Sequence, residues 1–219
     1  MIEWLWLHKL GPNGPSKNLF LLFRDYQNDN PAFILYKIWY NKIYIKFYTM
    51  NQKKLLIWEI FGIVFLILSG SFMHFLYSDI WQSVFASIIA PINESVWEHM
   101  KLAYIPLLLW SILEFNFLKI KSIGHFIYIK VLEMYLIIFS IISLFYLYTW
   151  ILKRNLFILD ILTYVFAVII GQVFSYIQLS KKQYQKYQLM IGLLLAFLLI
   201  FAFSLFTFWQ PNLGLFKVE

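Results

Sequence analysis

The sequence predicts an all-α integral membrane protein, a polytopic transmembrane helix bundle of about five spans plus a short interfacial or re-entrant helix. Hydrophobic residues make up 62% of the chain and its mean hydropathy is +0.71, whereas soluble domains are about 45–50% apolar. Only 13% of the residues are charged, too few to coat a soluble surface of this size. Several apolar runs approach the ~20 residues that cross a bilayer as a helix.

Residues 1–49 differ from the rest of the chain. They contain the breakers L-G-P-N-G-P and Q-N-D-N-P and then a stretch rich in Tyr, Lys, Ile and Asn, without a spanning run. At Met50 the sequence changes to a short basic head, M-N-Q-K-K, that leads into an apolar run. We expect residues 1–49 to be a non-native extension upstream of a start at Met50, or a peripheral segment lying on the membrane. Residues 50–217 are expected to form the integral membrane helical domain.

Five spans are expected after Met50. They cover approximately residues 55–77, 94–115, 126–150, 156–179 and 189–208. Between the first two, apolar residues recur at helical spacing from Trp81 to Ile89, which predicts the short interfacial or re-entrant helix. The lipid bilayer is therefore the first expected partner.

The basic residues predict the orientation of the spans. Seven lysines flank one set of span ends, namely Lys53, Lys54, Lys119, Lys121, Lys181, Lys182 and Lys186. Three basic residues, Lys153, Arg154 and Lys217, flank the other set. The positive-inside rule predicts a multi-pass protein of the plasma membrane with its N-terminus cytoplasmic and its C-terminus outside. The net charge of +7 has the same explanation, so nucleic acid is not expected as a partner, and the lack of cysteine excludes disulfides and thiolate metal sites.

The most polar segment, P-I-N-E-S-V-W-E-H-M-K, lies at the mouth of the second span, from Pro91 to Lys101. A charged side chain within a span costs about 2.5–3.5 kcal/mol on insertion scales, so it needs a partner or a use. One interpretation is structural: a capped helix start that complements the helix dipole, with Glu98 paired to Lys101 at i, i+3. In this interpretation the capping residue is Asn93, and the structural residues are Asn93, Glu94, Ser95, Trp97 and Lys101.

The other interpretation of this segment is a metal or proton site. The expected topology brings five ligand-type residues to the outer level of the membrane, namely His74, Glu94, Glu98, His99 and Asp160. Two histidines with carboxylates form a ligand set that suits zinc or iron. A membrane hydrolase would use such a metal to lower the pKa of a bound water molecule, and its catalytic candidates are Glu98, His99 and Asp160. Neither an H-E-x-x-H nor an H-x-x-x-H pair is present.

A second polar set is expected near the inner ends of the spans. Its members are Glu59, Glu114, His125, Lys130, Glu133, Gln172 and Ser175. Lys130 and Glu133 are three residues apart, and this spacing predicts an intramembrane ion pair. Glu59, about one turn past Lys54, is expected to pair with a basic residue at the inner interface.

Three segments of the chain resemble a family of small multi-spanning bacterial membrane proteins of unknown function, mostly from Gram-positive lineages and marked by an N-E-S-V-W-E-H box. The segments are L-L-I-W-E-I from Leu55, G-S-F-M-H-F-L-Y from Gly70 and P-I-N-E-S-V-W-E-H-M-K-L from Pro91. The resemblance covers about residues 50–216. The closing segment departs from the family, which tends to have a proline pair and a further proline where this chain has Gln210-Pro211 and Gly214. The resemblance implies a membrane fold with a site at the box, and it implies no activity.

Three functions remain open, and whether the protein is an enzyme is undecided. The leading interpretation is a non-catalytic integral membrane subunit or regulator, whose box binds a membrane protein partner or a second copy, or supports folding. The second is a membrane-embedded metal-dependent hydrolase that acts on a lipid. The third is a small proton- or cation-coupled transporter whose outer and inner carboxylates are stations for the ion. An odd number of spans without an inverted repeat weakens the third.

Overall fold

The computed structural model describes residues 51–77, 82–120, 122–181 and 187–217, so the expected extension at residues 1–49 lies outside the described residues. The chain divides into two units between Thr49 and Met50, and all the described elements belong to the second. These elements are α4 (Gln52–Phe75), α5 (Val84–Ile89), α6 (Val96–His99), α7 (Lys101–Leu118), α8 (Ile123–Leu152), α9 (Phe157–Leu179), α10 (Gln188–Phe208) and the 3-10 turn η2 (Gly214–Phe216). The described residues contain no strand, and the predicted all-α class is confirmed.

Five helices of the described residues are long and apolar enough to cross a membrane, as predicted. They are α4, α6 and α7 together, α8, α9 and α10. The second span begins at Val96 and not at Glu94, because Ser95 is the residue that caps it. The Ser95 hydroxyl accepts a hydrogen bond from the Glu98 N–H, whereas the Asn93 side chain accepts one from the Ser95 N–H in the turn before the helix. The prediction that Asn93 caps the helix was therefore wrong by two residues.

The expected short helix between the first two spans corresponds to α5, and Trp81 lies outside the described residues. Ser83 caps α5, because its hydroxyl accepts a hydrogen bond from the Ala86 N–H. Val84 and Phe85 are exposed, while the helix contacts α7 and α10 on its other side. A short helix with one apolar side outward is typical of a segment at a membrane interface.

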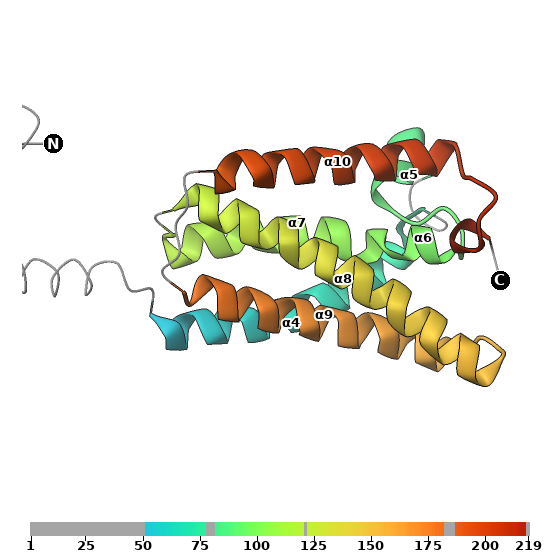
Figure 1. The fold of residues 1–219 in the computed structure, drawn as a ribbon, viewed down its shortest axis with the longest axis horizontal. Coiled ribbons are helices and arrows are strands. Elements are labelled where there is room, and N and C mark those ends of the chain that lie inside the picture. The colour runs from blue at the N-terminus through green and yellow to red at the C-terminus, as the bar shows by residue number, and fades with distance from the viewer. Residues whose placement is uncertain (1–50, 78–81, 121, 182–186, 218–219) are drawn as a thin grey trace, which may run out of the picture. The chain divides into compact units, whose positions relative to one another are not determined.

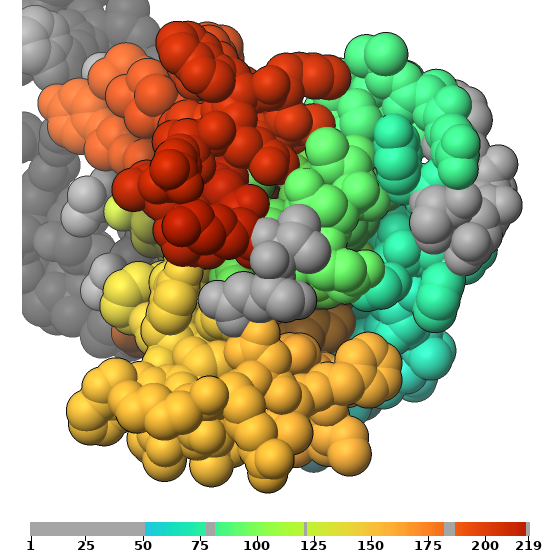
Figure 2. Space-filling view, turned by 90° about the vertical axis from the view of Figure 1, so that its right-hand side faces the viewer, coloured from blue at the N-terminus to red at the C-terminus, as the bar shows by residue number. Residues whose placement is uncertain are grey.

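The spans alternate in direction, so that successive spans cross the bundle in opposite senses (Figure 1). Helix α4 packs against α7 and α9, and α8 packs against α9 and α10. One end of the bundle carries α5, α6, η2 and the turn between α8 and α9, and we call it the box end (Figure 2). The other end, where α4 and α10 begin, is called the opposite end.

Apolar side chains dominate the interior of the bundle and most of its outer surface. Leu66, Met100, Leu107 and Ile137 are buried together at the centre. Large apolar side chains are also exposed along every span, which is the distribution that lipid contact requires. A polar group inside this bundle can therefore be satisfied only by other protein groups or by a bound molecule.

A proline interrupts the hydrogen bonding of α7. Pro106 has no N–H, so the carbonyl oxygen of Leu102 loses its helical donor. The Tyr164 hydroxyl of α9 lies 3.2 Å from this oxygen and 2.8 Å from the carbonyl oxygen of Leu66. Gly70 makes the approach possible, since a Cβ atom at that position would overlap the tyrosine hydroxyl. Three helices thus share one hydrogen-bond donor at the level of the proline.

Candidate functional site

The second glutamate of the box is part of a buried, balanced ion pair. Glu98 and Lys101 are both 0% exposed, and Lys101 Nζ lies 2.6 Å from Glu98 Oε2. The ammonium group also donates to the Ser87 carbonyl oxygen at 2.8 Å and to Thr207 Oγ1 at 2.7 Å. The Ile92 N–H donates to Glu98 Oε2 at 3.1 Å. All three hydrogens of the ammonium group have acceptors, so this pair links α5, α6, α7 and α10 structurally.

Two of the expected metal ligands therefore lie outside the ligand group at the box end. Glu98 is held by Lys101, and Asp160 in the first turn of α9 accepts a hydrogen bond from the Tyr148 hydroxyl. Glu94 precedes the helix that begins at Val96, so it does not share a helical face with Glu98 and Lys101. Equal depth in the membrane was likewise insufficient to bring Asp160 to the histidines.

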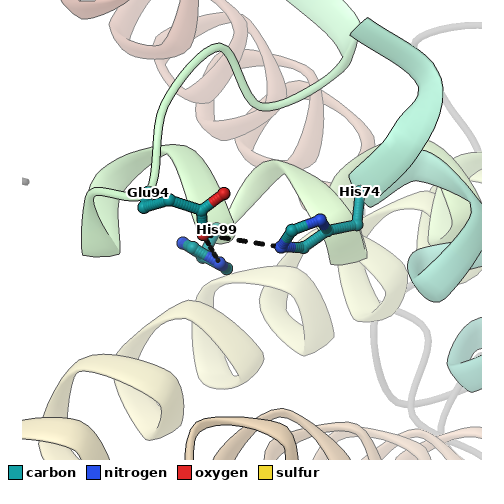
Figure 3. Close-up of side chains that lie close together, drawn as sticks. All are labelled: His74, Glu94 and His99. Carbon is teal, nitrogen blue, oxygen red and sulfur yellow. Dashed lines mark ion pairs between the residues drawn. The ribbon is translucent and has the colours of Figure 1, made fainter. Parts of the chain in front are cut away.

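The remaining three expected ligands do converge, and we call them the histidine–glutamate triad: His74, Glu94 and His99. His74 comes from the last turn of α4, Glu94 from the loop before α6, and His99 from the end of α6 (Figure 3). Glu94 Oε2 lies 3.5 Å from His74 Nε2 and 3.3 Å from His99 Nε2. One ligand atom from each residue lies within 4.8 Å of the others. The triad is thus one group of donors built from segments on both sides of α5.

The backbone orients one of these histidine rings. His99 Nδ1 lies 3.0 Å from the carbonyl oxygen of Ser95. A carbonyl oxygen can only accept a hydrogen bond, so Nδ1 carries the hydrogen, and in the neutral ring Nε2 offers its lone pair to the side of Glu94. Ligating histidines in metalloproteins are commonly held in this way through their second nitrogen.

The triad is partly exposed at the surface of the box end. The side chains of His74 and His99 are 31% and 29% exposed, and that of Glu94 is 62% exposed. All three residues lie at the ends of helices, away from the apolar middle of the spans. An ion or small molecule can therefore reach the triad without crossing the bundle.

Aromatic packing fixes the box beside the triad. The Trp97 ring lies 5.2 Å from the rings of Phe203 and Phe206 in α10 and 5.1 Å from the ring of Phe216 in η2, between ring centroids. Aromatic pairs at such distances contribute about 0.5–1.5 kcal/mol each beyond their buried area. Trp97 therefore attaches α6 to the last span and to the segment that follows it.

A second group of charged residues lies inside the bundle nearer the opposite end. Lys130 Nζ lies 2.9 Å from Glu133 Oε2, which is the pair that the spacing predicts, but also 2.6 Å from Glu114 Oε2 and 3.7 Å from Glu59 Oε2. Ser175 Oγ accepts a hydrogen bond from Lys130 at 2.8 Å and donates one to Glu59 Oε1 at 2.7 Å. We call these five residues the carboxylate–lysine cluster. Four spans contribute to it.

The sequence placed these residues at one level but did not show that they meet. Glu59 contacts a lysine inside the bundle, and not one at the interface as expected. His125, which was expected at the same level, instead has its Nδ1 atom 3.1 Å from Gln188 Oε1. The signal that could have found the cluster was the presence of one glutamate on each of three spans, about one to three turns from the same end of the bundle.

Comparison with known proteins gives a family. A model described as a family of unknown function, DUF6512, matches residues 45–219. No curated protein and no solved structure matches the chain. The match agrees with the resemblance of residues 50–216 to a family without an assigned activity, so no role is transferred to any residue.

Proposed function

The chain belongs to the DUF6512 family of unknown function, so its activity must be argued from its own residues. We propose that it is an integral membrane protein that binds a divalent transition metal at the histidine–glutamate triad. The convergence of the three ligand atoms within 4.8 Å of one another carries the proposal. Ligand atoms bound tetrahedrally at the usual zinc distances stand about 3.3–3.6 Å apart. Glu94 Oε2 lies at such distances from both histidine nitrogens, 3.5 Å and 3.3 Å.

The donor set of two histidines and one carboxylate suits zinc and also iron(II). We commit to zinc, because catalytic zinc sites of this composition combine three protein ligands with one water molecule.

The hydrogen bond from His99 to Ser95 supports the proposal independently. It directs a lone pair of the neutral ring, at Nε2, toward a carboxylate oxygen 3.3 Å away. A neutral His99 ring and the Glu94 carboxylate are both acceptors at this contact, so they face each other favourably only when a proton or a metal ion lies between them. A metal ion that also contacts His74 satisfies all three residues at once.

Such a centre can perform hydrolysis. Three protein ligands leave a fourth position on zinc for water, and zinc lowers the pKa of bound water enough to give a nucleophile at neutral pH. The triad lies at the helix ends, where headgroups are within reach of a multi-pass protein. We therefore propose a metal-dependent hydrolase that cleaves an ester of a membrane lipid, in preference to the non-catalytic subunit that the sequence alone favours.

The proposal also includes the orientation of the bundle in the membrane. The distribution of lysines and arginines supports a box end outside the cell and an opposite end in the cytoplasm. In that orientation the triad faces the outer leaflet of the plasma membrane and takes its metal from the extracellular medium.

Metal analysis tests the binding. The full-length protein, purified in mild detergent and incubated with zinc, should retain about one equivalent by mass spectrometry, and His74→Ala and His99→Ala should lose it. Asp160→Asn is the matched control, since it removes a carboxylate at the same end of the bundle but outside the triad. A wild-type protein without metal, or a His99→Ala variant with undiminished metal, would overturn the proposal.

Hydrolysis is tested separately with the zinc-loaded protein in vesicles of phosphatidylglycerol and phosphatidylethanolamine. Release of a water-soluble headgroup or a fatty acid should depend on zinc and should disappear in His99→Ala. Metal binding without release of either product would reject the hydrolase and leave a metal-binding subunit.

A further inference from the structure

We propose that the carboxylate–lysine cluster is a proton-binding site, which holds exchangeable protons on its carboxyl groups inside the membrane-spanning bundle. The inference concerns residues nearer the opposite end of the bundle than the histidine–glutamate triad, and it does not depend on metal binding. It rests on the charge balance of the cluster, on the position of the lysine, and on a second polar layer beside it.

The cluster contains more negative than positive groups. Three carboxyl groups, those of Glu59, Glu114 and Glu133, face a single ammonium group, that of Lys130. The glutamates are at most 2% exposed and the lysine is 5% exposed. Ionisation of all three would leave an excess of two negative charges in an apolar bundle, where an uncompensated charge is costly. Two of the three carboxyl groups must therefore carry a proton or meet another cation.

The position of Lys130 selects protons over a metal ion. Its ammonium nitrogen lies 2.6 Å, 2.9 Å and 3.7 Å from oxygens of the three glutamates. This is the central place that a shared cation would need, and the lysine already fills it. The second oxygens of Glu114 and Glu133 are buried and have no hydrogen-bond partner among the described residues. Protons on such oxygens neutralise the charge and require no additional space.

Lys130 faces three carboxyl groups and one hydroxyl group on its own helix and on the helices packed around it. Helix α4 contributes Glu59, α7 contributes Glu114, α8 contributes Glu133, and α9 contributes the hydroxyl of Ser175. Helix α10 adds no ionisable group, since it contributes only Ala196, Leu199 and Ile200 to the cavity that Lys130 lines. No second cation of the described residues pairs with these glutamates.

The buried pair at the box end is an example of a structural ion pair, in which one positive charge neutralises one negative charge. Glu98 and Lys101 are one acid and one base, and each ammonium hydrogen has an acceptor. The carboxylate–lysine cluster has two more carboxyl groups than its one ammonium group can neutralise. A purely structural ion pair does not require Glu59 and Glu114 beside Lys130.

A layer of polar groups lies one helical turn from the cluster toward the box end. Gln172 is 0% exposed, and neither its amide oxygen nor its nitrogen has a hydrogen-bond partner among the described residues. The indole nitrogen of Trp110 is buried and unpartnered as well. Both groups lie against Gly62, where a Cβ atom would be 2.8 Å from Gln172 Oε1 and 2.6 Å from Trp110 Nε1. A buried amide can both donate and accept hydrogen bonds, which a path for protons requires.

A cavity offers the cluster a route for exchange. It has a volume of about 370 Å³, lies between α7, α8 and α10, and has Lys130 in its wall. Most of its lining is apolar, but Ser111 and Asn116 of α7 also line it. Asn116 is exposed near the opposite end, so the cavity connects the cluster toward that surface.

Infrared spectroscopy of the full-length protein in detergent tests the inference. At neutral pH the wild type should show the C=O band of protonated carboxyl groups, and the band should shift when the solvent is exchanged for D2O. Glu59→Gln and Glu114→Gln should each reduce its intensity. Asp160→Asn is the matched control and should leave the band unchanged, because that carboxylate lies outside the cluster and accepts a hydrogen bond from the Tyr148 hydroxyl. Absence of the band, or equal intensity in all variants, would overturn the proposal.

A second variant tests the proposal even if the glutamine substitutions prevent folding. Lys130→Met removes the only positive charge of the cluster, so all three carboxyl groups must then be protonated. The band should grow about 1.5-fold, as two protonated groups become three. An unchanged band in folded Lys130→Met protein would contradict the proton count and the proposal with it.

Discussion

The Tyr164 hydroxyl of α9 lies 3.2 Å from the Leu102 carbonyl oxygen of α7, the acceptor that Pro106 leaves without a helical donor. An unsatisfied carbonyl group is expensive in an apolar bundle, and neighbouring helices commonly supply the missing donor. The tyrosine also reaches Leu66 of α4. A break in one span is therefore compensated by a side chain from another.

Tyr164→Phe should lower the free energy of unfolding by about 0.6–1.7 kcal/mol, the range of hydrogen bonds inside membrane proteins. Thermal unfolding in detergent measures the loss. In a Pro106→Ala background the residue at position 106 can donate to Leu102 again, so the same substitution should cost less. An equal loss of stability in both backgrounds would show that the tyrosine does not compensate for the hydrogen bond that Pro106 removes.

Gly70→Ala should be destabilising by about 1–3 kcal/mol, the usual cost of overpacking. The added Cβ would lie 2.7 Å from Tyr164 Cζ, so the aromatic ring must move. Unfolding by denaturant measures the effect, and the exposed Ser71→Ala provides the control, with a change within about 0.5 kcal/mol. The cost of Gly70→Ala should fall in a Tyr164→Leu background, and a cost that stays constant would place the strain elsewhere.

Removing one partner of the buried pair at the box end should be severe. Glu98→Gln and Lys101→Met should each lower the free energy of unfolding by about 3–5 kcal/mol, because the other charge remains buried. The double variant leaves no charge and should recover a large part of that loss. Equilibrium unfolding of the four proteins gives the coupling energy, and additive losses would mean that the two residues act separately.

Zinc binding at the triad should weaken as the pH falls. Histidine binds a metal only in its deprotonated form, so protons compete with zinc for His74 and His99. Titrations with zinc at a series of pH values measure the change in affinity. His125→Ala, which removes a histidine that is hydrogen-bonded to Gln188, should leave the profile as it is. A flat profile for the wild type would argue that the histidines are not ligands.

Hydropathy was sufficient to predict the spans, because length and apolar content alone decide whether a helix can cross a bilayer. The pairing of Glu98 with Lys101 was also accessible from helical spacing. The position of Glu94 was not, since it depends on whether Asn93 or Ser95 caps the helix. Because Ser95 is the cap, the helix begins two residues later, and Glu94 lies in the preceding loop, where it contacts His74.

The carboxylate–lysine cluster could not be derived in full for a different reason. Spans that are apolar nearly all round do not reveal how each helix is rotated about its axis. Glu59 and Glu114 could have faced other partners at the same depth. Only the packing of α4, α7, α8 and α9 fixes the rotations that bring both glutamates to Lys130.

The stack of Trp97 against Phe203, Phe206 and Phe216 has a consequence for biogenesis. Every ring that packs against Trp97 in this stack comes from the last span or from the turn after it. At about 5–20 residues per second, the ribosome needs several seconds between the tryptophan and its last partner. Throughout that interval His99 belongs to a segment without its aromatic support. The box therefore matures after the membrane insertion of α10, at the end of synthesis and not at the time when its own residues emerge.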